Sequence, residues 1–410
     1  MNDDLETTSQ ISPAVDERIW RLVGYPLVPG ADEGGLLAGE SVAVKDLFDV
    51  AGFPVGAGNP AFLAEARPAA GHAPALRALI EAGAQVRGIA RTDEFAYSIT
   101  GTNAHYGTAP NPRSPLGLPG GSSSGPAAAV AMGQASIGLG TDTAGSIRVP
   151  ASYQGLWGLR TTHGAVSRAG LLALAPSFDT VGWITRTPDL LRRVAEVSLP
   201  PHLDPLPTGG QYVVCRALLD LAAPTVRAAF AEALAAWKQS GALPAVDEVD
   251  LPDPVVTREA FRTVQAAEAW REHGPWITAH PGALGADVAA RFAWAATVTP
   301  DHEAEARAVL DRVRGQIDQV LADRVLLLPS APTAPPPRSA DAAALDAVRT
   351  ATITLTCLAA VTGRPALSAP LLEAERAEVG VSLLGPRGSD LGLIGLATTL
   401  ARAAPHRRLP

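Results

Sequence analysis

Hydrophobic and polar positions follow two different periods along the first half of the chain. Residues 73–84 carry apolar side chains at helical spacing and end near a glycine, which is typical of an amphipathic helix. Short, mainly apolar runs beside such segments predict buried strands. This alternation predicts an α/β architecture on a largely buried sheet. The expected strands are 41–50, 85–91, 135–142 and 155–161, and the expected helices are 73–84 and 125–134.

A proline-rich stretch at 199–210 leads into a more helical second half. It is either a domain boundary or a surface crossing, and we favour the surface crossing. Residues 211–219 predict a strand, residues 324–337 predict a strand that enters a stiff loop, and residues 381–401 predict a strand, a loop and a closing helix. The amphipathic, alanine-rich helices expected here are 224–238, 256–272 and 303–323.

Composition limits the kinds of partner that the protein can have. With 410 residues, 47% of them hydrophobic and 18% charged, the chain can bury a sizeable core. A net charge of −8 argues against nucleic acid as the main partner, because phosphate binding needs a basic surface. The acidic N-terminus is unlike a secretory or transit peptide, and no long apolar run predicts a membrane span. We expect a cytoplasmic monomer or homodimer that binds neither nucleic acid nor membrane.

The cysteines and histidines give no sign of a metal or disulfide framework. Cys215 and Cys357 are too few and too far apart in sequence, so we expect buried, inert thiols. His105 and His163 lie in predicted loops, where a lone histidine is usually structural. No group of His, Cys, Asp or Glu has metal-ligand spacing, so we expect no metal and no cofactor.

Lysine is rare in this chain, which draws attention to Lys45. The other lysine, Lys238, lies near the end of a predicted helix, whereas Lys45 lies in a predicted apolar strand. Burial disfavours the charged form of lysine and lowers its pKa, so Lys45 could act as a base, a role that arginine cannot fill. Alternatively, its stem packs in the core while its ammonium reaches water or pairs with Asp46 or Asp49.

Two turns of small residues contain candidate nucleophiles. Residues 119–126 (PGGSSSGP) satisfy G-x-S-x-G around Ser123, but such an elbow follows a strand, and the proline-rich 112–120 cannot be one. The stretch also lacks the ending of a phosphate-binding loop. Residues 140–152 (GTDTAGSIRVPAS) predict a second turn around Ser146, whose backbone amides could stabilise the oxyanion of an acyl-transfer reaction.

The combination of these features is more specific than any one of them. Lys45, Gly-Gly-Ser-Ser at 120–123 and Asp-Thr-Ala-Gly-Ser-Ile-Arg at 142–148 resemble the amidase signature family of serine amidohydrolases, including the spacing of the serines. The resemblance is strong over roughly 40–190 and looser in the C-terminal third. The stretches Asn-Ala-His-Tyr-Gly and Ser-Phe-Asp-Thr-Val-Gly-Trp look especially like plant-type indole-3-acetamide amidohydrolases and their bacterial relatives.

The resemblance implies a fold. We expect a single amidase signature domain over 1–410, with a mixed, mostly buried central sheet covered by helices. The core motifs would lie in 40–190, a variable, helix-rich substrate region in about 200–340, and a C-terminal strand–helix closure in about 350–405.

The resemblance also implies roles for individual residues. Ser146 would be the nucleophile, Ser122 the bridging hydroxyl after a cis peptide bond from Gly121, and Lys45 the ultimate base. The expected supporting residues are Gly121, Thr141 on the Ser146 side, Asp142 and Arg148. The backbone amides expected to hold the oxyanion are those of Thr143, Ala144, Gly145 and Ser146, and the expected pocket wall is Tyr97, Ser98, Ile99 and Thr100.

These roles imply an amidohydrolase that uses water to cleave a small neutral carboxamide to a carboxylate and ammonia. A non-catalytic docking or binding relative and the glutaminase subunit of a tRNA-dependent amidotransferase are the alternatives. An α/β-hydrolase centred on Ser123 is a further catalytic rival. Indole-3-acetamide is a candidate substrate by similarity alone, beside aryl and aliphatic amides.

Overall fold

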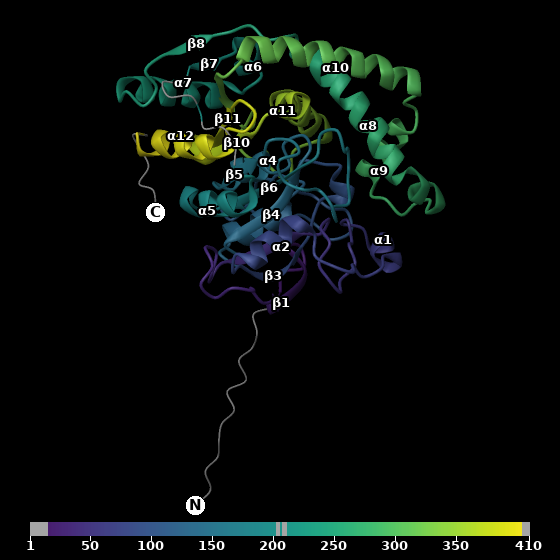
Figure 1. Cartoon of the computed structure of the whole chain (residues 1–410). Helices are drawn as coiled ribbons and strands as arrows, with labels where there is room; N and C mark the ends of the chain where they lie inside the picture. Colours follow the sequence, from purple (N-terminus) through teal and green to yellow (C-terminus); the bar gives the residue numbers. More distant parts are fainter. Residues whose placement is uncertain (1–14, 202–205, 207–210, 404–410) are drawn as a thin grey trace, which may run out of the picture.

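One mixed sheet of eleven strands runs through the chain in a computed structural model that describes residues 15–201, 206 and 211–403 (Figure 1). The expectations for the N-terminal ten residues and for most of 199–210 lie outside the described residues. The spatial order is β1-β3-β2-β4-β6-β5-β10-β11-β9-β7-β8. The strands are β1 (Trp20–Val28), β2 (Ser41–Lys45), β3 (Gln85–Ala90), β4 (Ile137–Asp142), β5 (Trp157–Arg160), β6 (Thr180–Thr185), β7 (Tyr212–Val214), β8 (Val246–Glu248), β9 (Val325–Pro329), β10 (Ala366–Ala374) and β11 (Ala377–Leu384).

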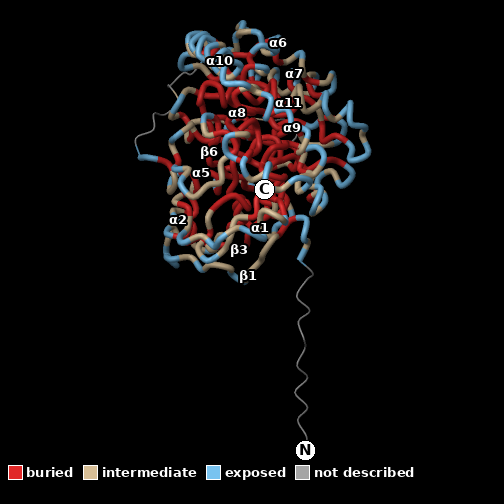
Figure 2. The backbone as a smooth tube through the Cα atoms, turned by 90° about the vertical axis from the view of Figure 1, so that its right-hand side faces the viewer, coloured by how far each residue is buried: buried red, intermediate tan, exposed pale blue. Residues whose placement is uncertain are grey.

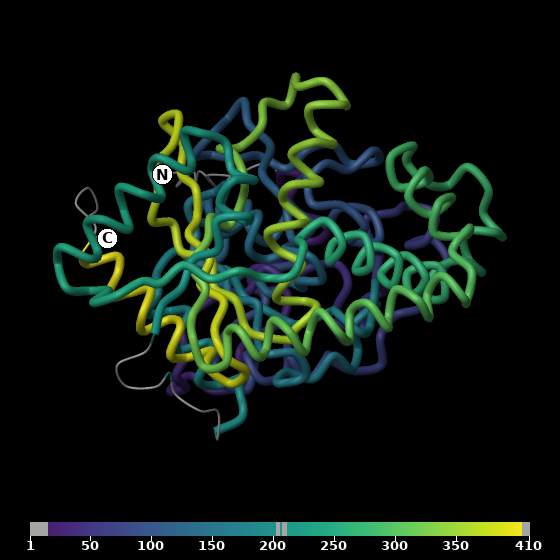
Figure 3. Tube along the Cα trace, turned by 90° about the horizontal axis from the view of Figure 1, so that it is seen from above, coloured from purple at the N-terminus to yellow at the C-terminus, as the bar shows by residue number. Residues whose placement is uncertain are grey.

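Helices cover both faces of this sheet and bury its centre (Figure 2). Helices α2, α5, α7 and α12 contribute to the largest apolar cluster on one face, and α3 and α4 pack on the other, while α8, α10 and α11 pack against one another. Helices α9 and α12 lie at opposite ends of the molecule (Figures 1 and 3). The helices are α1 (Pro60–Glu65), α2 (Pro74–Glu81), α3 (Ser124–Ala131), α4 (Arg148–Tyr153), α5 (Pro188–Ser198), α6 (Arg216–Leu219), α7 (Pro224–Gln239), α8 (Pro254–Ala279), α9 (Ala286–Ala295), α10 (Pro300–Leu321), α11 (Ala342–Thr362) and α12 (Asp390–Arg402).

The expected α/β class and mixed, mostly buried sheet are confirmed. Strands of both halves pair within the one sheet, because β5 is hydrogen-bonded to β10. Two predicted elements differ from the structure. The strand expected over 211–219 ends at Val214 and continues as helix α6, and the strand expected over 41–50 ends at Lys45 and continues as a turn.

Helix α11 is the principal element that the sequence pattern did not predict. Its second half contains four threonines, one isoleucine and one valine, β-branched residues that ordinarily favour strands. All four threonine hydroxyls lie within hydrogen-bond distance of the carbonyl four residues earlier, which satisfies them inside the helix, and they belong to Thr352, Thr354, Thr356 and Thr362. By length and apolar composition α11 could cross a membrane, but residues 352–362 are all buried in this fold.

The direction of the strands places the chemistry at one edge of the sheet. Strands β3, β2 and β4 are parallel neighbours, so their carboxyl ends meet. Alternation along β2 sends Val42 and Val44 into the large apolar cluster on one face and Ala43 toward α3 on the other. Lys45, the last residue of β2, therefore projects on the α3 side, where the ends of parallel strands commonly form sites.

Candidate active site

The amine of Lys45 is fully buried and hydrogen-bonded to two hydroxyls. Its Nζ lies 2.8 Å from Ser122 Oγ and 2.7 Å from Thr141 Oγ1, and the side chain has no exposed surface. The alternative in which the ammonium reaches water or pairs with a neighbouring aspartate is therefore wrong. The expectation that Thr141 supports the Ser146 side differs from the structure, because its hydroxyl contacts the lysine directly from near the carboxyl end of the neighbouring parallel strand.

Burial lowers the pKa of Lys45 from about 10.5 to about 7. The carboxylates of Asp93, Asp179 and Asp142 oppose this shift, because negative charge favours the protonated amine, but burial outweighs them. An amine with this pKa loses its proton near neutral pH while it remains hydrogen-bonded to Ser122. That combination is what a proton acceptor requires.

The loop that carries Ser122 is fixed from both sides. The peptide bond between Gly121 and Ser122 is cis, as expected. The carbonyl of Ser122 accepts from Thr92 Oγ1 at 2.9 Å, and Ser124 Oγ donates to Asp93 Oδ1 at 2.9 Å. A side chain on Gly121 would lie 2.3 Å from Asp93 Oδ2, so only glycine fits. Asp93 thus shapes the loop, a role that no spacing in the sequence indicated.

Ser123 has a different environment from Ser122 and Ser146. It is fully buried, and its hydroxyl donates to the carbonyl of Thr141 at 3.2 Å. It begins helix α3 without a preceding strand, and it does not line the pocket that Ser146 lines. These features do not fit a nucleophile elbow.

The turn that carries Ser146 is built around a buried carboxylate. Asp142 accepts from Arg148 Nε at 3.0 Å and Nη2 at 2.9 Å, and Arg160 Nη1 lies 3.2 Å from its Oδ1. Burial alone would raise the pKa of Asp142, but the two guanidinium groups hold it far below its usual value. Thr356 of α11 donates to the carbonyl of Ala144 at 2.6 Å and closes the turn from the other side.

Three of the four expected oxyanion donors are available. Within the described part of the chain, the amides of Thr143, Ala144 and Ser146 donate to no protein group, and these three residues line one pocket. The Gly145 amide differs from the expectation, because it donates to Asp142 Oδ1 at 2.8 Å. Gly145 has a φ of 114°, a backbone conformation that favours glycine, and it shapes the turn instead.

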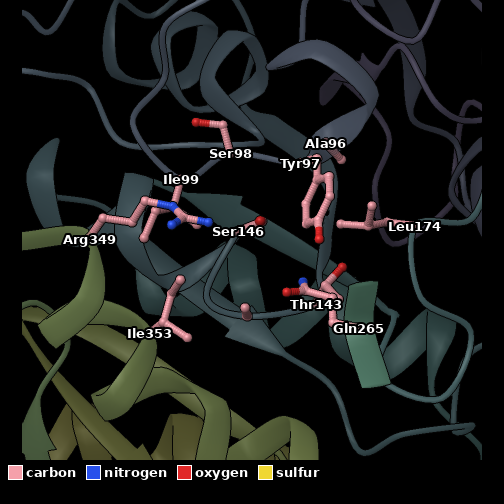
Figure 4. Close-up of a pocket in the computed structure, with 11 residues that line it drawn as sticks. Ala96, Tyr97, Ser98, Ile99, Thr143, Ser146, Leu174, Gln265, Arg349 and Ile353 are labelled. Carbon is pink, nitrogen blue, oxygen red and sulfur yellow. The ribbon is translucent and has the colours of Figure 1, made fainter. Parts of the chain in front are cut away.

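The pocket beside Ser146 is narrow and mainly apolar (Figure 4). The empty space within its lining, part of which is open solvent, is about 300 Å³. Tyr97, Ser98 and Ile99 line it as expected, whereas Thr100 lines a neighbouring pocket that shares Ile99. The remaining lining residues are Ala96, Thr143, Ala144, Leu174, Gln265, Arg349 and Ile353.

Several residues of this site had no individual signal in the sequence. Asp179 accepts from Thr143 Oγ1 at 2.5 Å, and Asp179 and Asp93 lie within stretches that resemble the family without having an assigned role. Gln265 and Arg349 come from helices α8 and α11, in regions without a motif. Only the folded chain brings them to Ser146.

His105, His163 and the two cysteines lie in structural positions. His105 Nε2 lies 2.6 Å from Glu94 Oε1, and the backbone amide of His163 donates to the Gly363 carbonyl. Burial lowers the pKa of His163 to about 4. Both cysteines are buried and free. Among the described residues, no three His, Cys, Asp or Glu side chains converge as metal ligands.

Comparisons with known proteins agree on one family. The family model described as Amidase matches residues 27–199. Amidase 1 of Arabidopsis thaliana is 36% identical over 89% of this chain and 93% of its own length. The 2-amino-5-chloromuconic acid deaminase of Comamonas testosteroni is 35% identical over 90% of this chain and 82% of its own. A solved structure described as an amidase superposes with a TM-score of 0.83 at 29% identity, over 95% of this chain and 92% of the other.

Proposed function

Because the chain belongs to the amidase signature family and is a hydrolase of amide carbon–nitrogen bonds, we propose that it cleaves a small carboxamide to a carboxylate and ammonia through a Ser–Ser–Lys relay. The observation that carries the proposal is the 2.8 Å contact between the buried amine of Lys45 and Ser122 Oγ. This amine has a pKa of about 7 and can accept a proton at neutral pH. Ser146 lines the adjacent pocket with Thr143 and Ala144, and in the described part of the chain the backbone amides of these three residues donate to no protein group.

In the first half of the reaction, Ser146 Oγ attacks the carbonyl carbon of the amide. Its proton passes to Ser122, whose own proton passes to neutral Lys45. The carbonyl oxygen becomes an oxyanion, which the amides of Thr143, Ala144 and Ser146 stabilise. The carbon–nitrogen bond then breaks, the relay returns a proton to the leaving nitrogen, and ammonia departs from an acyl-Ser146 ester.

In the second half, water replaces ammonia. The relay takes a proton from water as its oxygen attacks the ester carbonyl, and the same amides stabilise the second oxyanion. Collapse of this intermediate breaks the ester bond and returns the proton to Ser146. The products are the carboxylate and the free enzyme.

A docking or binding role would not require these features. A purely structural site has no use for a fully buried lysine whose charged form is destabilised by burial. Nor does it need three backbone amides left without a protein acceptor beside a serine hydroxyl. These features favour the catalytic proposal over the docking alternative.

The proposal is tested by ammonia release from a panel of small amides. We expect turnover by the wild-type protein and its loss in Ser146→Ala and Ser122→Ala, while Ser240→Ala, at the exposed end of α7, serves as the control. A fluorophosphonate probe should label Ser146 in the wild type. Labelling of Ser123 instead, or equal turnover by wild type and both variants, would overturn the relay.

A further inference from the structure

A partly buried arginine shares the candidate active-site pocket with Ser146. Arg349, from α11, lines this pocket and also the neighbouring one, and its side chain is only 16% exposed. Figure 4 shows its guanidinium group directed toward the middle of the pocket, where the Ser146 hydroxyl lies. Arg349 lies outside the glycine- and serine-rich motifs at 119–126 and 140–152, and the proposed relay does not use it.

Few protein groups balance the positive charge of Arg349. Its Nε is buried and has no hydrogen-bond partner among the described residues. The nearest carboxylate, Asp346 Oδ1, lies 3.8 Å from Nη1, and the Asp346 side chain is 73% exposed, so solvent screens the pair. A cation that is largely removed from water and has so weak a partner is costly unless another anion completes its surroundings.

The neighbouring charges add to this positive potential. Burial, followed by the charges of Arg291 and Arg262, lowers the pKa of Arg349 to about 10, while Tyr97 and Asp346 oppose this shift. Arg291 donates to the carbonyl of Tyr97 at 3.0 Å, which fixes a second guanidinium group beside the pocket wall. Arg349 is the one charged side chain among the described residues that line the pocket, and Arg291 and Arg262 lie close enough to act on its charge.

We propose that the substrate of this amidase is an acidic amide, whose carboxylate binds Arg349 while its carboxamide lies against Ser146. The inference rests on the proposed function, and it replaces the expectation of a neutral substrate. A guanidinium group can bind a carboxylate through two parallel hydrogen bonds, which also fixes the orientation of the ligand.

The walls between the two groups suit a short hydrocarbon chain. Ile99, Ile353 and Leu174 supply apolar surface in the pocket that Ser146 and Arg349 share. Apolar walls with one charged anchor are typical of small-molecule sites. Monoamides of dicarboxylic acids combine the required groups: a carboxamide, a short carbon chain and a carboxylate.

The test compares acidic amides with neutral amides of the same shape. We would measure kcat/KM for ammonia release from the monoamides of the dicarboxylic acids from malonate to adipate, each beside the neutral amide in which a methyl group replaces the carboxylate. The variants are Arg349→Gln, Arg349→Lys and, as a control, Arg312→Gln, an exposed arginine on α10. Thermal unfolding with added succinate or glutarate gives a second readout that needs no turnover.

We expect the wild type to prefer at least one acidic amide over its neutral counterpart by roughly tenfold to a hundredfold, the range for one hydrogen-bonded charge. Arg349→Gln should lose more kcat/KM on the acidic amide than on its neutral counterpart, by that same factor, Arg349→Lys should keep part of the preference, and Arg312→Gln should match the wild type. Glutarate or succinate should raise the melting temperature of the wild type and not that of Arg349→Gln.

Two other results would overturn the inference. One is a wild type that prefers neutral amides and is not stabilised by either dicarboxylate. The other is an Arg349→Gln variant that loses activity equally on acidic and neutral amides, since that result indicates a structural role. If no amide releases ammonia, the proposed hydrolysis fails, while stabilisation by dicarboxylates still decides whether Arg349 binds carboxylates.

Discussion

Lys45 owes its chemistry to its position as the last residue of a buried strand. The strand alternation turns it away from the large apolar cluster and toward the loop that carries Ser122. Because the amine contacts hydroxyls and not carboxylates, no ion pair stabilises its charged form at close range. Burial of this amine affects both the rate of the reaction and the free energy of unfolding, and each can be measured separately.

The pH dependence of the rate is expected to report the protonation of Lys45. The base must be neutral, so kcat/KM should fall about tenfold per pH unit below about 7 and level off above it. The measurement is the rate of ammonia release from one amide in well-buffered solutions across this pH range. Lys238→Ala, which removes the other lysine, should keep the profile, while Lys45→Ala should lose the activity. A profile without the acid limb would contradict the role of Lys45.

Replacing Lys45 with methionine should abolish activity and yet stabilise the fold at neutral pH. The shift from about 10.5 to about 7 corresponds to a cost of about 5 kcal/mol at about 1.36 per unit. The variant also loses the hydrogen bonds to Ser122 and Thr141, which contribute about 1 kcal/mol each. The expected net gain in the free energy of unfolding is therefore a few kcal/mol.

The gain should depend on pH in a defined direction. Between pH of about 7 and 10.5 the unfolded lysine holds a proton that the folded one has lost, so wild-type stability rises with pH there. The stability gain of Lys45→Met over the wild type is therefore largest below a pH of about 7 and shrinks as the pH rises toward about 10.5. Denaturant unfolding at several pH values measures it. A variant less stable than the wild type at neutral pH would show that burial is not the dominant cost.

At the scale of elements, helix α11 joins the nucleophile turn to the pocket. It contributes Thr356 to the turn and Arg349 and Ile353 to the lining. Local pattern did not predict this helix, because its threonine-rich second half favours strands in isolation. Burial on all sides and hydroxyl-to-carbonyl bonds within the helix override that preference. The amphipathic helices α7, α8 and α10 could be predicted because they have one polar face.

Thr356→Val tests the connection between α11 and the turn. The substitution keeps the shape and removes the 2.6 Å bond to the Ala144 carbonyl, so the adjoining oxyanion donors lose a support. We expect kcat to fall by roughly tenfold and stability by about 1 kcal/mol, as for one lost hydrogen bond. The matched control is Thr362→Val, another buried threonine of α11 whose hydroxyl bonds only within the helix. Equal effects on kcat in both variants would remove the special role of Thr356.

At the scale of the whole molecule, the sequence predicted the centre of the site better than its walls. Lys45, Ser122 and Ser146 lie in short motifs whose glycines and serines are required by tight turns, so spacing alone carries information about them. Arg349 and Gln265 come from helices that pack over the sheet from far along the chain, and their positions follow from tertiary packing. Asp93 acts through space on Gly121, and no period in the sequence encodes such a contact.

Asp142 connects the site to the stability of the entire sheet. Its carboxylate lies at the end of β4 and binds Arg148 of α4 and Arg160 of β5, all three almost fully buried. Asp142→Asn leaves the two guanidinium groups without their counter-charge, and breaking a buried pair in this way costs about 3–5 kcal/mol. We expect a loss of that size in denaturant unfolding, seen alike by circular dichroism and tryptophan fluorescence.

The matched control for Asp142→Asn is Asp220→Asn, which removes an exposed carboxylate 3.4 Å from the exposed Arg227 Nη1 and should cost less than about 1 kcal/mol. Because the pKa of Asp142 is depressed, its stabilising charge is present above the unfolded value of about 3.8 and is lost as pH falls through the lower folded value. The difference between wild type and Asp142→Asn should therefore persist at neutral pH and narrow only in strong acid. A difference that disappears already near neutral pH, or that the Asp220 variant reproduces, would mean that Asp142 acts locally on the turn and does not hold the sheet together.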